Sequence, residues 1–346
     1  MEDVLVTVGS QPRYRLAALP TPLHELPRLR EALGGSRRSP RILIKRDDLT
    51  GLAFGGNKAR KLEFLVGDAL RQGASVLVTS GAVQSNHARM TAAAARAAGM
   101  EAALVLTAES ASPPIQGNLL LDHLLGAAIH FIPSNPDPRI AIGDEEAAKV
   151  AEVTGALRAR GERPYVIPVG GSGAVGVLGY VTATLEIAGQ LLEMGESPVR
   201  LYYASGSRGT QAGLTLGAKL YGVPCRLCGI AVSGGEPEKT ARARRIANEA
   251  AELLGTPTRV REEDLTTDQE YLGTGYGIPT AGSVEAIRLL AQTEGIFLDP
   301  VYTAKAMAGL IDHVRRGLIP PGESVLFLHS GGTPALFAHA GDFDWG

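Results

Sequence analysis

A lysine at the start of an expected helix is the first residue whose position could support chemistry. Lys58 ends the Gly-Gly-Asn-Lys segment at residues 55–58, and an apolar helical pattern begins there. A helix N-terminus carries partial positive charge, which lowers the pKa of an amine. Such an amine is a better nucleophile toward a carbonyl group or an aldehyde. The local sequence also fits a solvated basic turn, because Arg60 and Lys61 follow directly.

Two loops could bind anions through backbone N–H groups. Residues 79–87 lead from an expected strand into a helix that Ser85 or Asn86 can cap, so the first N–H groups there could hold a carboxylate. Residues 205–213 lead from the expected strand at 200–204 into the expected helix at 210–220. They contain small residues and hydroxyls, which suit one phosphate. They lack the lysine of a nucleoside-triphosphate loop, so we expect a monophosphate. Either loop can also be an ordinary polar turn, and His87 can be a base or a surface residue.

A third loop has the glycine spacing of a dinucleotide site. Residues 171–176 match G-x-G-x-x-G after an expected strand. A dinucleotide site also needs an acidic residue at the end of the following strand, to hold the ribose hydroxyls. That strand, at residues 200–204, runs into Ser205 and Gly206 without a carboxylate. A dinucleotide-dependent oxidoreductase therefore stays as the alternative from a different class.

Cysteines and histidines do not form a metal-binding pattern. Cys225 and Cys228 open an apolar run that is typical of a strand, where residues three apart point to opposite faces. The seven histidines are scattered without an H-E-x-x-H spacing. We therefore expect core packing for the cysteines and no metal site.

Short β-branched segments alternate with longer helical patterns along the chain. Strands are expected at residues 41–45, 75–79, 102–107, 128–132, 165–169, 200–204, 227–232 and 324–329. Helices are expected at residues 58–72, 86–98, 116–125, 144–160, 177–193, 210–220, 237–254, 281–293 and 303–316. This alternation predicts an α/β fold with parallel sheets between helices, in which ligands bind at loops after strand C-termini.

Length and composition narrow the class of protein. A chain of 346 residues with 45% hydrophobic residues exceeds the usual size of a single core, so we expect two domains. Its formal charge of −2 provides no basic field for nucleic acid, and no run reaches about 18 apolar residues, so we expect no nucleic-acid or membrane partner. Two cysteines fit a reducing compartment, and we expect a cytoplasmic protein.

A lysine, a monophosphate loop and a carboxylate loop together fit a pyridoxal-phosphate enzyme. Longer segments then occur in order over roughly residues 20–337: KRDD at 45–48, GGNK at 55–58, RKLE at 60–63, QSNH at 84–87, VIPVGGS at 166–172, GYG at 275–277 and DPVYT at 299–303. In these segments the chain resembles the D-cysteine desulfhydrase and 1-aminocyclopropane-1-carboxylate deaminase family.

The resemblance implies an overall architecture. That family has the tryptophan-synthase-β-like fold, pyridoxal-phosphate fold type II, with two three-layer α/β domains, parallel-rich sheets and a homodimeric assembly. Residues 1–55 plus 175–346 would form the large cofactor-binding domain, and residues 56–174 the small domain. The glycines at 171–176 would then serve close packing and hinge geometry where the two domains rejoin.

The resemblance also implies a role for each site residue. Lys58 would hold pyridoxal 5′-phosphate covalently and take the Cα proton, the turn of Ser85, Asn86 and His87 would bind the substrate carboxylate, and Tyr276 and Tyr302 would face the substrate as catalytic residues. Asn86 would also hydrogen-bond the cofactor 3′-oxygen, and the phosphate would lie on residues 206–210. The implied cofactor-binding residues are Lys58, Asn57, Asn86, Ser205, Gly206, Ser207, Gly209, Thr210, Thr303 and Ser330.

Within the family, the residue after the second tyrosine separates two activities. Ring-opening deaminases place Glu there, against the pyridine nitrogen, whereas desulfhydrases place Thr there and a second hydroxyl residue in a C-terminal H-x-G-G segment. This chain has Thr303 and Ser330 at these positions. Neutral partners weaken the electron sink of the ring, which suits β-elimination because the leaving group takes the electrons. Two departures from the family are Arg208, where a small residue is expected, and Ser330, where Thr is more usual.

These residues predict a lyase that converts D-cysteine to pyruvate, sulfide and ammonia, with a small amino acid as substrate. Other activities of the family stay open, namely cysteate sulfo-lyase, β-chloroalanine elimination and 1-aminocyclopropane-1-carboxylate deaminase. A non-catalytic module that binds pyridoxal phosphate or an amino acid is a further alternative.

Overall fold

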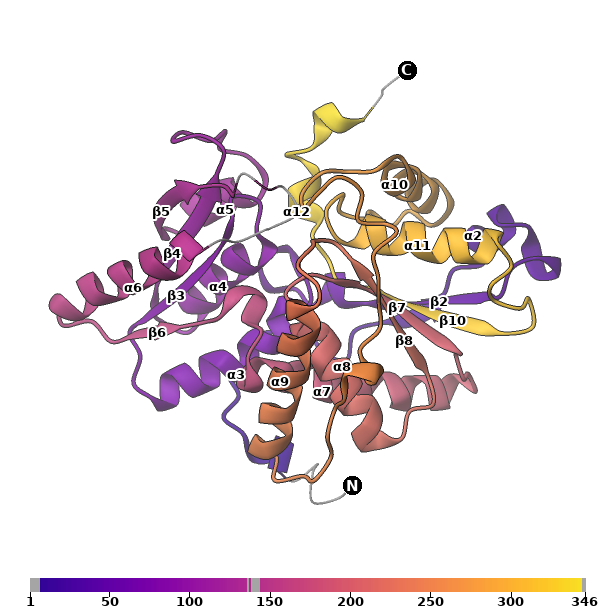
Figure 1. The fold of residues 1–346 in the computed structure, drawn as a ribbon, viewed down its shortest axis with the longest axis horizontal. Coiled ribbons are helices and arrows are strands. Elements are labelled where there is room, and N and C mark those ends of the chain that lie inside the picture. Colours follow the sequence, from indigo (N-terminus) through magenta and orange to yellow (C-terminus); the bar gives the residue numbers. More distant parts are fainter. Residues whose placement is uncertain (1–6, 136, 138–143, 344–346) are drawn as a thin grey trace.

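Two β-sheets organise the chain, and helices pack against both of them (Figure 1). The computed structural model describes residues 7–135, 137 and 144–343. The larger sheet has six strands in the order β1-β2-β10-β7-β8-β9, and only β1 and β2 are antiparallel. Its strands are β1 Leu23–Glu25, β2 Arg41–Arg46, β7 Arg200–Ser205, β8 Arg226–Ala231, β9 Thr267–Asp268 and β10 Ser324–His329.

The smaller sheet has four parallel strands in the order β5-β4-β3-β6. These are β3 Val76–Ala82, β4 Glu101–Ala108, β5 Ala128–Pro133 and β6 Pro164–Val166. They come from one continuous part of the sequence, whereas the larger sheet joins strands from both ends of the chain. Two parallel-rich sheets were expected, and the domain boundaries near residues 55 and 175 stay a prediction.

The helices agree closely with those expected from sequence. They are α2 Pro27–Ala32, α3 Lys58–Arg71, α4 Asn86–Ala97, α5 Gly117–Leu124, α6 Asp144–Ala159, α7 Ala174–Met194, α8 Gly209–Tyr221, α9 Glu238–Leu253, α10 Ala281–Glu294, α11 Thr303–Arg315 and α12 Thr333–Leu336. The sequence did not predict β1, β9, α2 and α12, which are too short to show a periodic pattern. The expected strand at 165–169 ends early, at Val166, because the chain turns into a 3-10 helix at Val169–Gly171.

Side chains on the larger sheet alternate between two cores. In β2, Ile42 and Ile44 pack in a cluster with residues of α10 and α11, while Leu43 packs in a different cluster with residues of α7. The two cysteines divide in the same way, since Cys228 packs against the first cluster and Cys225 against the second. Both cysteines are free thiols. The prediction that they point to opposite faces is confirmed.

Helix α7 begins inside the glycine-rich segment at 171–176, at Ala174. It is the one helix among the described residues that is long and apolar enough to span a membrane, and 56% of that apolar window is buried against the rest of the protein. A Cβ atom on Gly176 would lie 2.1 Å from the carbonyl oxygen of Gly171, and one on Gly179 would lie 2.3 Å from that of Arg60. Gly176 therefore serves the close packing expected for this segment, Gly179 does so beyond it, and the hinge role of the segment stays a prediction.

Candidate active site

A cavity of about 680 Å³ is lined by loops that follow strands of both sheets. The small sheet contributes the turn after β3, and the larger sheet contributes the loops after β7, β8 and β10. The predicted site residues that line this cavity are Asn57, Lys58, Ser85, Asn86, His87, Ser205, Gly206, Ser207, Thr210, Tyr276, Tyr302 and Ser330. Gly209 and Thr303 are not among the lining residues.

Lys58 is the first residue of α3, and its partly buried side chain lines the cavity. Its Nζ donates a hydrogen bond of 2.8 Å to Oδ1 of Asn57. Burial lowers the Lys58 pKa to about 8, the nearby Arg89 guanidinium adds to the effect, and the Asp299 carboxylate opposes it. The expected direction of the pKa shift is confirmed, with burial as its main cause. Arg60 and Lys61 are also buried, which contradicts a solvated basic turn.

The loop before Lys58 needs its glycines. Gly55 and Gly56 have φ values of 71° and 128°, and a Cβ on Gly55 would lie 1.9 Å from the carbonyl oxygen of Asp48. The segment that follows β10 also holds this loop, because the backbone N–H of Asn57 donates a hydrogen bond of 2.9 Å to the carbonyl oxygen of Ser330. These contacts bring Lys58 and Ser330 to the same cavity.

The loop after β7 lies at the N-terminus of α8, where backbone N–H groups favour an anion. Nδ2 of Asn57 donates 3.1 Å to the Thr210 hydroxyl, so the lysine turn and this loop are joined. The Gly209 amide instead donates 3.1 Å to the Ser172 hydroxyl, which lies 2.8 Å from the Ser207 hydroxyl. Gly209 therefore supports the loop through its hydrogen bond to Ser172 and does not line the cavity.

The sequence did not predict that Lys61 lies beside the loop after β7. Its amine is fully buried, donates 3.0 Å to the carbonyl oxygen of Gly170, and would lie 2.7 Å from a Cβ on Gly209. Burial and the neighbouring Lys58 lower the Lys61 pKa well below its usual value. Residues i and i+3 share a helix face, and this spacing from Lys58 was the available signal.

Arg208, the unexpected residue of this loop, is held by its side chain. It has a left-handed φ of 71°, which typically costs a non-glycine residue about 1–2 kcal/mol. Its buried guanidinium donates 2.9 Å to Ser205 Oγ and 3.0 Å to Gln211 Oε1, and it also forms an ion pair with Glu236. These contacts offset the backbone cost and connect the loop to the segment that precedes α9.

The turn after β3 offers donors for an anion. Ser85 is the N-cap of α4 and its Oγ accepts 3.1 Å from the Ala88 amide, so the hydroxyl hydrogen can still be donated. Asn86 Oδ1 accepts from Arg89 and from Asn118, at 3.2 and 2.9 Å, which turns its amide nitrogen into the group available for a ligand.

His87 is a buried residue of this turn and not a surface one. Its Nε2 lies 2.9 Å from the Thr79 hydroxyl. Burial, with help from the Lys58 and Lys61 charges, holds the His87 pKa well below its usual value. The imidazole is therefore neutral at neutral pH.

Two tyrosines of the cavity lining contact each other. The hydroxyls of Tyr276 and Tyr302 are hydrogen-bonded, and their rings are 5.9 Å apart in an edge arrangement of 71°. Burial raises the pKa of Tyr302 well above its usual value and also raises that of Tyr276, so both hydroxyls stay protonated.

Asp299 organises the turn that carries Tyr302. Its carboxylate accepts the amides of Val301, Tyr302 and Thr303 at 3.0, 2.9 and 2.8 Å. The Thr303 hydroxyl donates 2.7 Å to Asp299 Oδ1, so it is used inside this turn. Of the two hydroxyls expected beside a pyridine ring, only Ser330 lines the cavity. No cluster of three or more potential metal ligands occurs among residues 7–135, 137 and 144–343.

Comparison with known proteins decides what this geometry belongs to. The sequence profile of pyridoxal-phosphate-dependent enzymes matches residues 14–331. The chain belongs to the pyridoxal-phosphate-dependent enzyme family. Its relatives include D-cysteine desulfhydrases of Salmonella choleraesuis strain SC-B67 and Salmonella newport strain SL254, each 44% identical over 335 residues, which cover 95% of this chain and 96% of the relative.

Solved structures agree with this family. An ACC deaminase homologue is 38% identical, with a TM-score of 0.88 over 99% of this chain and 98% of that one. A threonine deaminase isoform from Solanum lycopersicum is 18% identical, with a TM-score of 0.63 over 96% of this chain and 84% of that one, and shares the fold. The chain therefore has the expected tryptophan-synthase-β-like fold and requires pyridoxal phosphate, which replaces the dinucleotide alternative.

The groups that line the cavity match the chemical groups of pyridoxal phosphate. It contains a buried amine with a lowered pKa for the aldehyde, and a helix N-terminus with the hydroxyls of Ser207 and Thr210 for the phosphate. The buried amine of Lys61 lies beside that loop, where a bound phosphate dianion would favour its charged form. The Asn86 amide nitrogen is the donor that would hold the ring oxygen.

The lowered pKa of Lys58 predicts how cofactor capture depends on pH. Only the neutral amine attacks an aldehyde, so the initial rate of pyridoxal phosphate capture by apo-protein should rise with a midpoint near pH 8 and level off above about pH 9. An ordinary lysine, with a pKa of about 10.4, would still be gaining rate at pH 10. Stopped-flow absorbance from pH 6 to 10 measures the capture rate, with Nα-acetyl-lysine as the reference amine. A protein midpoint near that of the reference would contradict the burial of Lys58.

Proposed function

We propose that this protein is a carbon–sulfur lyase that converts D-cysteine and water to pyruvate, hydrogen sulfide and ammonia. The observation that carries the proposal is the 44% identity, over 95% of the chain, to proteins named D-cysteine desulfhydrase. The site supports it, because a neutral hydroxyl residue, Ser330, lines the cavity and no carboxylate stands at position 303. Bound pyridoxal phosphate supplies a conjugated ring that withdraws electrons from the substrate Cα.

Lys58 has two tasks in this proposal. It holds the cofactor, and once its amine is free it takes the Cα proton of the substrate. Its lowered pKa suits the second task, because a base with a pKa near the working pH is in the correct protonation state in a large fraction of molecules. Asn57 orients the amine through its 2.8 Å hydrogen bond and also contacts Thr210 of the phosphate loop.

The tyrosine pair is placed to assist the departure of sulfide. When the Cβ–S bond breaks, sulfur leaves with the electron pair and needs a proton. The two hydroxyls carry two hydrogens, and their mutual hydrogen bond uses one of them. The other can be donated in a hydrogen bond that stabilises the leaving thiolate, because raised pKa values keep both tyrosines protonated. The remaining enamine is hydrolysed to pyruvate and ammonia.

Ser85 is proposed as a donor to the substrate carboxylate, and two substitutions separate this role from helix capping. Ser85→Ala and Ser85→Gly both remove the hydroxyl, so each should weaken binding of D-alanine, a substrate analogue without a leaving group, by roughly ten- to a hundredfold. Only alanine should lower stability appreciably, by about 1 kcal/mol, because glycine is tolerated at an N-cap. Spectroscopic titration and thermal unfolding provide the two measurements. Normal D-alanine binding with weakened cofactor binding would assign Ser85 to the cofactor instead.

Ring opening of 1-aminocyclopropane-1-carboxylate is the second candidate. The 38% identity to a structure named as an ACC deaminase homologue favours it. The two activities are compared by release of pyruvate from D-cysteine and of ketobutyrate from the cyclopropane substrate, with L-cysteine, cysteate and β-chloroalanine in the same series. Faster turnover of any substrate other than D-cysteine would replace the proposed reaction.

We further propose a homodimer located in the cytoplasm, with a large domain at 1–55 plus 175–346 and a small one at 56–174. Exposed apolar side chains near α5 and α12 support an association surface, among them Ile115, Leu124 and Phe337. The two helices are neighbours in Figure 1. The two free cysteines support a reducing compartment.

A further inference from the structure

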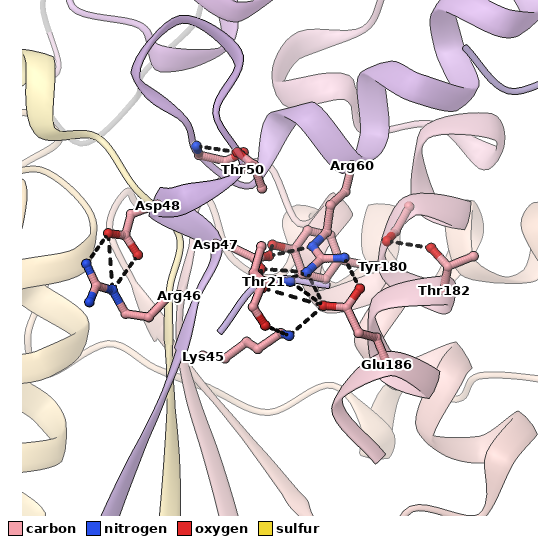
Figure 2. Close-up of polar contacts among 12 residues, drawn as sticks. Thr21, Lys45, Arg46, Asp47, Asp48, Thr50, Arg60, Tyr180, Thr182 and Glu186 are labelled. Carbon is pink, nitrogen blue, oxygen red and sulfur yellow. Dashed lines mark hydrogen bonds and ion pairs between the residues drawn. The ribbon is translucent and has the colours of Figure 1, made fainter. Parts of the chain in front are cut away.

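A buried group of charged side chains lies next to α3 but outside the cavity (Figure 2). Arg60 is its centre. The guanidinium donates to both oxygens of Asp47, at 2.9 and 2.8 Å, and to both oxygens of Glu186, at 2.9 and 2.8 Å. It also donates 3.0 Å to the Thr21 hydroxyl. Two carboxylates are thus each held by two hydrogen bonds from one side chain.

Further contacts complete this group and balance its charge. Tyr180 donates 2.6 Å to Asp47 Oδ2, and Lys45 forms an ion pair with Glu186. The group contains two cations, Lys45 and Arg60, and two anions, Asp47 and Glu186, so its net charge is zero. The side chains of Lys45, Asp47 and Arg60 are at most 1% exposed. Replacing a buried ion pair by apolar residues is often neutral or stabilising, so stability alone is a weak reason for this arrangement.

Its location connects it to the reactive lysine. Arg60 follows Lys58 by two residues, and at about 100° per residue the two side chains leave opposite sides of α3. One faces the cavity and the other faces the charged group. Asp47 stands at the other end of the loop that leads from β2 to Lys58, so the pair of Asp47 and Arg60 closes this loop.

The closed loop has a backbone that needs external support. Gly51, Ala53, Phe54, Gly55 and Gly56 all have positive φ values. Such a conformation in a residue other than glycine costs of order 1–3 kcal/mol and persists where surrounding contacts fix it. Helix α7 supplies Glu186 and approaches α3 closely at Gly179, where no Cβ would fit. The charged group therefore ties β2, α3 and α7 together at the loop's two ends.

We propose that Arg60 is a positioning residue for Lys58. By joining Asp47 and Glu186 it sets the rotation of the first turn of α3, and with it the point at which the lysine amine meets the cavity. The inference rests on the proposed role of Lys58. Because the group is neutral, it acts through geometry and not through its field. In agreement with this, the pKa of Lys58 responds to burial, Asp299 and Arg89.

Arg60→Lys tests the proposal, because it keeps the charge but loses the planar fork that reaches both carboxylates. A displacement of about 1 Å at a reacting group can cost about a hundredfold, so kcat with D-cysteine should fall about ten- to a hundredfold while KM stays within about twofold. The visible circular dichroism of the bound cofactor should change, and the midpoints of the pH profile should not. In apo-protein, hydrogen exchange should accelerate in the peptide covering residues 48–59.

Arg13→Lys is the matched control. Arg13 pairs with Glu63 of the same helix, at 2.6 Å, and does not contact the Lys58 loop. It should lower thermal stability without changing kcat, the dichroism or exchange at 48–59. If Arg60→Lys behaves like this control, or if it displaces the pH profile by a unit or more, the positioning role is wrong.

Glu186→Gln carries the same test if Arg60→Lys does not fold. It leaves the group with a net charge of +1 but keeps the shape and the Asp47 contacts, so kcat, the dichroism and the hydrogen exchange at 48–59 should change as for Arg60→Lys but by less, and the absence of these three changes would overturn the proposal. Failure of the proposed function is distinguishable, because it would appear in wild-type protein as absent D-cysteine turnover or as cofactor attached to another lysine. The exchange measurement in apo-protein does not depend on either.

Discussion

Lys58→Ala should leave a folded protein whose turnover of D-cysteine is lower by about 10²- to 10⁴-fold or more. The variant loses the group that holds the cofactor and the base for the Cα proton, and general base catalysis alone contributes a factor of this size. Borohydride reduction of wild-type holoprotein, followed by peptide mapping, should place the label on Lys58, and the variant should show no label.

Lys61→Met is the matched control for this experiment. Lys61 is more deeply buried than Lys58 and lies one turn along the same helix, beside the phosphate loop. Its loss should weaken cofactor affinity and leave the position of the label unchanged. A label on Lys61 in wild-type protein, or full activity in Lys58→Ala, would remove Lys58 from the proposed site.

Ser330→Asp should shift the reaction from elimination toward ring opening. Ring opening has no leaving group to take the electrons, so charge must be stored in the cofactor, and a protonated pyridine nitrogen is needed for that. A carboxylate partner typically moves a neighbouring pKa by 1–3 units, which raises the protonated fraction by roughly ten- to a thousandfold. Release of ketobutyrate from the cyclopropane substrate should increase, and release of pyruvate from D-cysteine should fall.

The structure favours Ser330 over Thr303 as the position for this test. A carboxylate at 303 would stand beside the buried Asp299 carboxylate, which the Thr303 hydroxyl contacts at 2.7 Å, and the two charges would repel each other. Thr303→Glu is therefore the control, with lower stability and without the gain in ring opening. If wild-type protein opens the cyclopropane ring faster than it eliminates from D-cysteine, the assignment of Ser330 as a neutral ring partner is wrong.

Local sequence patterns predicted the features that depend only on residues close together in the chain. The glycines before Lys58 are required by positive φ values and a close approach to Asp48, so the segment carries its structure in its composition. Ser85 was predicted as a possible N-cap from its place before a helix, and its side chain does accept a hydrogen bond from that helix. The long strands and helices were predicted because their apolar residues follow a regular period.

The features that sequence missed depend on contacts between distant segments. Lys61 gains its place beside the phosphate loop only when α3 packs near Gly170 and Gly209. Arg208 forms an ion pair with Glu236 in another loop, and neither segment has a sequence pattern that predicts this contact. Thr303 was expected in the cavity, but Asp299, four residues earlier, captures its hydroxyl, and this competition is not visible in a motif.

The pairing of β2 with β10 sets the time at which the site can exist during synthesis. Arg41 pairs with Ser324, so a strand made early waits for nearly the whole chain before it gains its neighbour. The lysine turn waits with it, because the Asn57 amide binds the carbonyl oxygen of Ser330 and Gly331 packs on Gly56. The small sheet, β3 to β6, can form while the ribosome is still working, since its four strands all lie within residues 76–166. Pyridoxal phosphate therefore meets its complete binding site only after residues 324–331 have emerged, and the cell must supply it to a finished chain.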